Sequence, residues 1–221
     1  MALGFYWLVD DELAGCARPG APGRGLTGPR WEEPPDSDAE YAALDSDLAW
    51  LRRQGIRAVL SLTETPLAED VVARHGLETL HLPVPDLTAP TPEQLMRALL
   101  FIDTQRAHGR AVAVHCLVGE GRTGTVLTAY RIRGGVAPEQ ALRELRAHRP
   151  GAVGSPTQER ALRAFATRLD RVTSAPDLRL KSHGRRRTLK CRWRRQYPPN
   201  VYALYTRLLL PSDVSHRSAS M

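Results

Sequence analysis

The sequence is poor in cysteine and contains no long apolar run. Three cysteines among 221 residues are too few for the disulfide framework of a small secreted domain. No apolar stretch approaches the ~20 residues that cross a membrane, and the amino-terminal segment lacks the pattern of a signal peptide. We therefore expect a soluble protein of a reducing cytoplasm, whose hydrophobic fraction of 42% suffices for a packed core.

Positive charge is concentrated near the carboxyl end. Residues 176–221 hold eleven Lys and Arg against two Asp, whereas residues 1–175 hold twenty against twenty-two acidic residues, so the net charge of +7 arises from the tail. Residues 181–195 alone carry eight basic residues and no acidic one. Such a block repels itself, which predicts that 175–221 is a disordered basic tail with weak contacts to polyanions at most.

Strand-like and helical patterns alternate before this tail. Their order predicts an α/β domain over residues 1–174, in which a mainly parallel sheet is covered by helices on both faces, with a Gly- and Pro-rich insertion at about 18–36. The expected strands are 5–9, 12–15, 56–62, 77–82 and 111–115; the expected helices are 38–53, a short one ending at 71–75, 92–108, 122–133, 138–148 and 156–169.

The short apolar run 111–115 leads into a glycine-rich turn and then a helix. Gly119, Gly121 and Gly124 allow sharp backbone turns, and the helical pattern begins at Arg122. The amides of this loop and the positive end of the helix dipole converge where an anion such as phosphate would bind. The residues that we assign to phosphate binding are Leu117, Val118, Gly119, Glu120, Gly121 and Arg122.

Cys116 stands at the start of this loop. A helix N-terminus stabilises a thiolate, which makes Cys116 a candidate nucleophile, and the planar guanidinium of Arg122 matches two phosphate oxygens. The Thr123 hydroxyl is placed to donate a hydrogen bond to the sulfur. A cysteine after a buried strand is more often a small core residue, but that interpretation leaves the glycines, the arginine and the helix start unexplained.

The segment from His115-Cys116 to Arg122-Thr123 resembles the signature of the protein tyrosine phosphatases, specifically of their small dual-specificity branch. The resemblance implies the cysteine phosphatase fold and a phosphocysteine intermediate, with no metal or other cofactor. It covers about residues 5–170 apart from the insertion, and it includes Phe5-x-Trp7, Leu13-Ala14-Gly15, Leu60 to Glu64, Pro85-Asp86 and Arg149-Pro150-Gly151.

The resemblance also implies a general acid. In this family an aspartate on a mobile loop protonates the leaving oxygen and later activates water; Asp86, thirty residues before Cys116, matches it. From the residues alone, a Pro-Asp pair is typical of a turn. Gln158 matches a glutamine that orients water in related enzymes, but Ser155-Pro-Thr-Gln158 is also a capping box, which explains the residue without a catalytic role.

Glu120 departs from the resemblance. Phosphoinositide phosphatases of this superfamily tend to carry lysine at this point of the loop, and a carboxylate there would repel a polyanionic headgroup. The alternative is a solvated glutamate that points away from the loop's mouth. Under either interpretation, the loop does not favour a highly charged inositol lipid.

These patterns predict a phosphatase that hydrolyses phosphotyrosine, and with it phosphoserine and phosphothreonine, in proteins. Its catalytic residues would be Cys116, Arg122, Asp86 and Thr123. Two alternatives are a rhodanese-type sulfur transferase, whose active loop also runs from Cys to Arg after a strand, and a non-catalytic phosphate-binding or scaffold module that acts through the basic tail. Asp86 and the Arg-Thr-Gly continuation disfavour the first; the intact set of Cys116, Arg122 and Asp86 disfavours the second.

Overall fold

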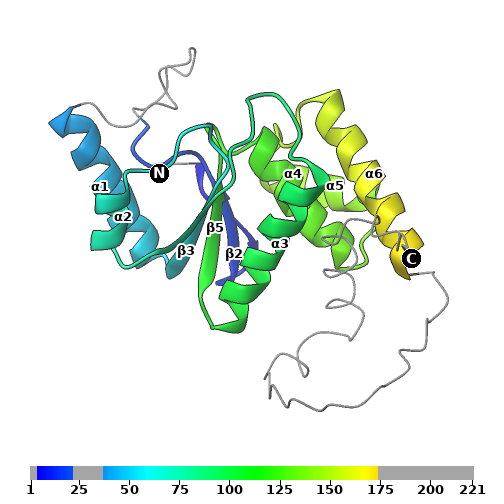
Figure 1. Cartoon of the computed structure of the whole chain (residues 1–221), viewed down its shortest axis with the longest axis horizontal. Coiled ribbons are helices and arrows are strands. Elements are labelled where there is room, and N and C mark those ends of the chain that lie inside the picture. Colours follow the sequence, from blue (N-terminus) through cyan, green and yellow to red (C-terminus); the bar gives the residue numbers. More distant parts are fainter. Residues whose placement is uncertain (1–3, 22–36, 174–221) are drawn as a thin grey trace, which may run out of the picture. The chain divides into compact units, whose positions relative to one another are not determined.

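The computed structural model describes residues 4–21 and 37–173. The basic tail, Cys191 and most of the Gly- and Pro-rich insertion, for which the sequence suggested disorder, lie outside these residues. The chain divides into two compact units, Met1–Thr167 and Arg168–Met221. The sheet and the candidate site belong to the first unit, which Figure 1 shows with its elements labelled.

The first unit is organised around a five-stranded sheet with the order β1-β2-β5-β3-β4. β1 is antiparallel to β2, and all the other neighbours are parallel. Cys16 and Ser61 flank His115 in the register, so three strands end at the same edge of the sheet. The strands are β1 (Tyr6–Val9), β2 (Leu13–Cys16), β3 (Ile56–Ser61), β4 (Glu78–His81) and β5 (Ala111–His115).

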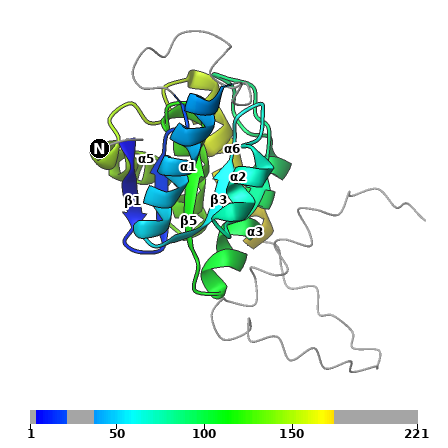
Figure 2. The same ribbon diagram turned by 90° about the vertical axis from the view of Figure 1, so that its left-hand side faces the viewer.

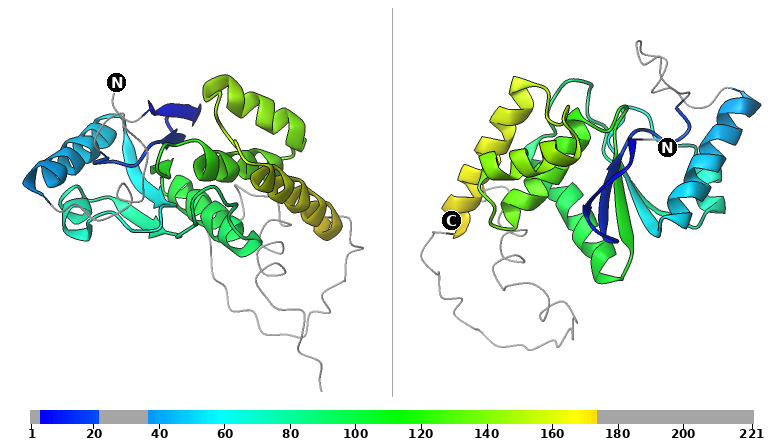
Figure 3. Two further views of the ribbon diagram at one scale, coloured as in Figure 1. Left: turned by 90° about the horizontal axis from the view of Figure 1, so that it is seen from above. Right: turned by 180° about the vertical axis from the view of Figure 1, so that it is seen from behind.

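Helices cover both faces of this sheet. Figure 1 and the turned view in Figure 2 show α1 and α2 against one face and α3 and α4 against the other, with α5 beyond α4. Figure 3 shows the same layers from above and from behind. The helices are α1 (Asp38–Arg53), α2 (Glu69–Arg74), α3 (Pro92–Ala107), α4 (Gly121–Arg133), α5 (Pro138–His148) and α6 (Pro156–Thr173).

Simple sequence patterns account for these elements. All five residues of β5 are buried, as expected for the central strand of a parallel sheet that is covered on both faces. α1 buries Leu44, Leu48 and Leu51, which recur at helical spacing, on its sheet-facing side. The capping box at Thr91 is present and starts α3. The predicted fold class is confirmed; the predicted end of the last helix at Leu169 is wrong, because α6 continues to Thr173.

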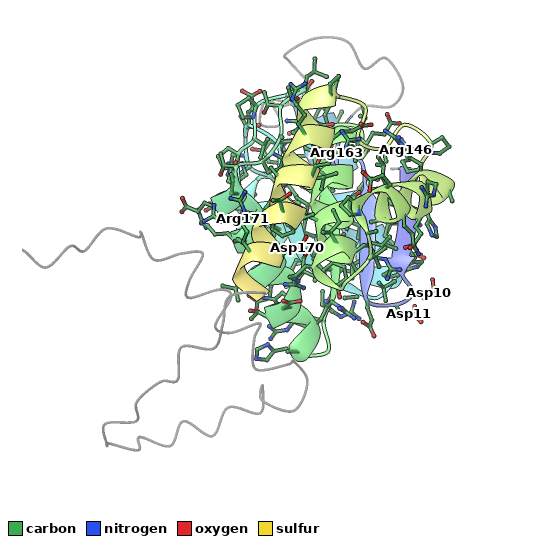
Figure 4. The ribbon with its side chains drawn as sticks, turned by 90° about the vertical axis from the view of Figure 1, so that its right-hand side faces the viewer. Asp10, Asp11, Arg146, Arg163, Asp170 and Arg171 are labelled. Atoms are coloured by element: carbon green, nitrogen blue, oxygen red, sulfur yellow. The ribbon has the colours of Figure 1, made fainter. Side chains whose placement is uncertain are left out.

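Salt bridges join the last two helices. Arg146 on α5 pairs with Glu159 on α6, and Arg163 pairs with Glu139 and Glu159. Figure 4 labels Arg146 and Arg163 on this side of the molecule. Arg146 also donates to the carbonyls of Ala152 and Val153, so the connection between α5 and α6 is held in place.

Within residues 4–21 and 37–173, no helix is long and apolar enough to span a bilayer.

Candidate active site

Cys116 directly follows β5, the middle strand of the sheet, and is 2% exposed. Five residues later the chain enters α4, so the loop of residues 116–122, here named the Cys116 loop, joins a strand's carboxyl end to a helix's amino end. Open α/β sheets bind ligands at this edge, and a helix N-terminus favours anions. The backbone therefore positions Cys116 beside a place suited to an anion.

Six consecutive carbonyls of the Cys116 loop accept hydrogen bonds from groups that surround it. Some of the donors are distant in sequence, and the others belong to the adjoining strand and helix. The bonds are from His115 Nδ1 to Cys116 O (3.2 Å), from the Arg18 amide to Leu117 O (3.0 Å), from Arg149 Nη2 to Val118 O (3.1 Å), from the Tyr6 hydroxyl to Gly119 O (3.3 Å), from the Gly124 amide to Glu120 O (2.8 Å), and from Thr125 Oγ1 to Gly121 O (2.8 Å).

This pattern fixes the direction of the loop amides. In a trans peptide the N–H of one residue points opposite to the C=O of the residue before it, and the structure contains no cis peptide among the described residues. Carbonyls 116–121 are held by the surroundings, so the amides of 117–122 point to the inner side of the loop. A concave row of N–H groups of this kind binds anions. The backbone amides of the six residues assigned to phosphate binding, 117–122, therefore face the same inner side of the loop.

Gly119 is required by close packing. It has φ of 76°, and a Cβ at this position would lie 2.6 Å from the backbone carbonyl of Cys16. Any side chain would therefore collide with β2 as well as strain the backbone. The approach allows the loop to curl tightly against the end of the sheet.

Arg122 is buried beneath the inner side of the loop, with 2% of its surface exposed. Its Nη1 donates to the carbonyl of Val84 at 3.0 Å, and its Nη2 lies 2.9 Å from Oδ1 of Asp86. Arg122 and Asp86, which the sequence analysis named as two of the catalytic residues, are thus in direct contact. A phosphate dianion and the Asp86 carboxylate are both anions, so they compete for this guanidinium.

Asp86 is carried by residues 83–88, here named the Asp86 loop. Its carboxylate is 55% exposed, although the backbone of the loop is tethered. The Asp86 amide donates to Glu64 Oε1 at 3.2 Å, and the carbonyl of Pro83 accepts from Gln94 Nε2 at 2.7 Å. The loop therefore presents a solvent-accessible carboxylate from a held backbone.

Gln158 connects the two loops, a role that the sequence interpretation missed. Its Nε2 donates to the carbonyl of Thr88 at 3.0 Å, and its amide packs so closely on Gly121 that a Cβ there would lie 2.8 Å from Nε2. Its Oε1 is buried without a hydrogen-bond partner among the described residues. Ser155 caps the helix, since its hydroxyl accepts from the Thr157 amide at 3.2 Å, but the predicted capping box is wrong, because the Gln158 side chain reaches the Asp86 loop instead. The family resemblance was the signal that favoured a role in the site.

His115 supports the loop as a neutral imidazole. Burial, and after it the charge of Arg18, lower the pKa of His115 to about 3. Nδ1 carries the proton that bonds to the Cys116 carbonyl, and Nε2 is buried without a partner among the described residues. Arg18 itself donates to Thr63 Oγ1 and to the carbonyls of Thr65 and Pro66. His115 is consequently neutral, and it holds the Cys116 carbonyl through Nδ1.

Thr123 is also fully buried, but its hydroxyl makes no hydrogen bond to the described residues. The predicted bond to the Cys116 sulfur is therefore not formed in this structure.

Burial, and then the charge of Cys116, raise the pKa of the Tyr6 phenol and of the Cys16 thiol above their ordinary values. Both groups stay neutral, which leaves Cys116 as the candidate nucleophile at this edge of the sheet.

Glu120 is tied to the rim of the loop. One carboxylate oxygen lies 3.0 Å from Arg149 Nη2, and the other lies so close to Gly151 that a Cβ there would be 2.5 Å away. Arg149 Nη2 also donates to Val118 O, so the pair braces the loop from outside. Glu120 is thus an engaged carboxylate, in contrast to the freely solvated one that was an alternative from the sequence.

Among the described residues, no group of three His, Cys, Asp or Glu side chains could hold a metal ion.

Comparisons with known proteins find similar phosphatases. The family model described as "Tc-R-P: Polymorphic toxin system, DSP-PTPase phosphatase" matches residues 36–136. Dual specificity protein phosphatase 12 of Homo sapiens is 38% identical over 108 residues, 46% of this chain and 31% of that protein. Phosphatidylglycerophosphate phosphatase PTPMT2 of Arabidopsis thaliana is 28% identical over 125 residues, 54% of this chain and 55% of that protein. The chain spans less than two thirds of the length of both curated relatives.

Among solved structures, Tk-PTP in its active form is 30% identical to the chain, with a TM-score of 0.61 and coverage of 76% of this chain and 99% of that one. The sheet, the Cys116 loop and this likeness define a protein of the protein tyrosine phosphatase superfamily. Within the superfamily, the chain belongs to the compact atypical dual-specificity branch.

Proposed function

We propose that the chain is a cysteine-dependent phosphatase that hydrolyses phosphotyrosine, and with it phosphoserine and phosphothreonine, in proteins through a phosphocysteine intermediate. The observation that carries the proposal is the set of six loop carbonyls that accept hydrogen bonds from outside. They turn the amides of 117–122 inward, in the segment that begins at Cys116 and ends at Arg122. Oriented amides act on a phosphoryl group at no reorganisation cost during the reaction.

In the first step, the Cys116 thiolate attacks phosphorus, an S–P bond forms and the bond from phosphorus to the ester oxygen breaks. The loop amides and Arg122 hold the phosphoryl oxygens, which neutralises the charge that they carry. When the dianion takes the place of the Asp86 carboxylate at Arg122, Asp86 is left beside the ester oxygen. In its protonated form Asp86 then transfers a proton to that oxygen, which departs as an alcohol or phenol.

In the second step, Asp86, now a carboxylate, takes a proton from water. The water oxygen attacks phosphorus, the S–P bond breaks, and inorganic phosphate and the Cys116 thiolate are released. Gln158 lies against Gly121 and reaches Thr88, so it keeps the Cys116 loop and the Asp86 loop at a fixed distance from each other in both steps. Thr123 is kept as a candidate donor to the leaving sulfur, because its buried hydroxyl has no partner among the described residues.

The substrate is proposed to be a protein because the named relatives include a dual specificity protein phosphatase and the solved neighbour is a PTP. A lipid phosphate is the competing class, because another relative is a phosphatidylglycerophosphate phosphatase. The Cys116 loop contains no basic residue apart from Arg122. A singly phosphorylated side chain is therefore the better match to the charge of the loop.

A steady-state assay with chelator present tests the proposal. Phosphotyrosine and phosphothreonine peptides and phosphatidylglycerophosphate vesicles are offered to the full chain, to Cys116→Ser and to Cys16→Ser, which changes the neighbouring buried cysteine. We expect turnover of the peptides by wild type and Cys16→Ser, and a loss beyond about 10⁴-fold in Cys116→Ser. Acid quenching during turnover should leave phosphate on the Cys116 peptide. Activity of Cys116→Ser within about tenfold of wild type would overturn the mechanism, and faster turnover of the lipid would overturn the substrate class.

A further inference from the structure

Leu87 has a conformation and an exposure that folding does not explain. It is 75% exposed, and together with Tyr41 it is one of two exposed large hydrophobic side chains among residues 4–21 and 37–173. Its φ is 58°, in the left-handed region that disfavours any residue with a Cβ. Leu87 therefore neither fills the core nor suits its own backbone.

The backbone around Leu87 forms a tight, well-anchored turn. The Thr88 amide donates to the Pro85 carbonyl at 3.2 Å, so Pro85 to Thr88 is a β-turn with Leu87 at its third position. A positive φ at this position is typical of type II turns, where glycine or asparagine is usual. The Leu87 carbonyl accepts from Thr157 Oγ1 at 3.4 Å, and the Thr88 carbonyl accepts from Gln158. The turn thus holds a leucine where a glycine would be easier to accommodate.

This turn stands next to the reacting groups. Asp86, the residue before Leu87, lies 2.9 Å from the Arg122 guanidinium. Proton transfer requires the ester oxygen of the leaving group within about 3 Å of the Asp86 carboxyl. The carbon atoms attached to that oxygen then lie close to the turn that carries Leu87.

We propose that Leu87 is a specificity-determining residue, the apolar wall against which the aromatic ring of a phosphotyrosine leaving group packs. The inference rests on the proposed function and deepens it by naming the preferred substrate class, aryl phosphates. Contact with apolar surface stabilises in proportion to the area removed from water. A phenol ring offers a broad apolar face at this position, whereas a serine leaving group offers a single methylene.

The test compares wild type with Leu87→Asn and Leu87→Gly on one peptide that carries either phosphotyrosine or phosphoserine. Asparagine and glycine both accept a positive φ, so neither variant strains the turn. We expect the ratio of kcat/KM for phosphotyrosine over phosphoserine to fall about fivefold in both variants. Inhibition by inorganic phosphate, which has no leaving group, should stay within about twofold, and the melting temperature should be equal or higher.

Asp11→Gly is the matched control. Asp11 has φ of 57° and is exposed, and Figure 4 labels it. It precedes β2, so the strand register places it at the end of the strands away from Cys116. This variant should gain stability in the same way and keep the substrate ratio. An unchanged ratio in both Leu87 variants, or an equal loss on both peptides, would overturn the inference and leave the phosphatase assignment intact. A wild-type protein that hydrolyses neither peptide would overturn both.

Discussion

The Cys116 loop and the Asp86 loop meet at Arg122, but they are constructed in opposite ways. Cys116 and Arg122 are each 2% exposed, whereas the Asp86 carboxylate is 55% exposed. The first loop is held through its carbonyls by both neighbouring and sequence-distant groups, and it continues directly into a strand and a helix of the core. The second is a turn on the surface, held at a few points by Glu64, Gln94 and Gln158.

This difference follows from what each loop has to do. A phosphate-binding loop must keep its amides oriented in every step, so it gains from being fixed by the fold itself. The Asp86 carboxyl must exchange partners and protons during a cycle, which requires access to water. Changes in the buried loop should therefore impair both catalysis and stability, while changes in the exposed loop should impair catalysis without loss of stability.

Arg122→Lys should have the largest effect. A lysine ammonium cannot reproduce the two-pronged contact with phosphate or reach both Val84 and Asp86 as Arg122 does. We expect kcat/KM for a phosphotyrosine peptide to fall at least about 10³-fold, together with a lower melting temperature because the residue is buried. Wild-type kinetics in this variant would show that phosphate binds elsewhere.

Asp86→Asn should separate catalysis from stability. We expect kcat to fall about 10²-fold for a tyrosyl phosphate, and much less for an activated aryl phosphate whose leaving group needs no proton. The melting temperature should stay within about 1 °C because the carboxylate is mostly exposed. Equal losses of kcat on the two substrates would indicate that Asp86 has a structural role.

His115 should make the stability of the buried loop sensitive to acid. Its pKa of about 3 lies below the ordinary value of 6.5, so the unfolded chain binds this proton more readily and stability is lost as the pH falls from 6.5 towards 3. Between pH 6.5 and 5, this group should lower the free energy of unfolding by about 1.6 kcal/mol, or roughly 16-fold in the unfolding constant. His115→Gln should lack this part of the pH dependence in urea titrations, and identical slopes in the two proteins would contradict the assignment.

Gln158→Ala should loosen the connection between the loops. Because Gln158 contacts Gly121 and donates to Thr88 O, its removal should lower kcat about tenfold with little change in inhibition by inorganic phosphate. Thr157→Ala is the matched control, since it removes from the same turn of α6 a weak bond of 3.4 Å to the Leu87 carbonyl and an exposed contact with the Ser155 hydroxyl. Equal effects of the two substitutions would show that Gln158 has no special positioning role.

Glu120→Gln should have the smallest effect. Its ion pair with Arg149 is partly exposed, and such pairs contribute about 1 kcal/mol or less. Arg149 can still donate to Val118 O, so we expect kcat/KM within about twofold of wild type. Arg149→Ala removes both contacts and should cost more; the opposite order would show that the carboxylate itself is needed at the rim.

Local sequence patterns predicted much of the fold. α1 and α5 occupy the ranges expected from helical spacing and their glycine or proline boundaries, because those signals lie within each segment. Cys116 and Arg122 could be identified for the same reason, since strand, turn and helix start are consecutive in the sequence. Asp86 was assigned to the site from the family resemblance, and its carboxylate contacts Arg122, which no sequence pattern had indicated.

The supports of the loop could not be derived in this way. Tyr6, Arg18 and Arg149 donate to carbonyls that are 31 to 113 positions away, and no spacing rule links them. Gln158 shows a second limit. The local sequence matches a capping box, but the Gln158 side chain bonds to the distant Thr88 carbonyl instead. A local pattern alone does not show which of these two hydrogen bonds is the more stable.

The bond from the Tyr6 hydroxyl to the Gly119 carbonyl makes catalysis depend on the order in which the chain assembles. Its partners are separated by 113 positions, and Arg149 reaches Val118 from a further 31 positions downstream. Contacts between such distant residues form late, because closing long loops is entropically costly. A refolding chain should therefore recover helical signal before it recovers turnover, so the return of activity reports the moment at which the amino-terminal strand has docked.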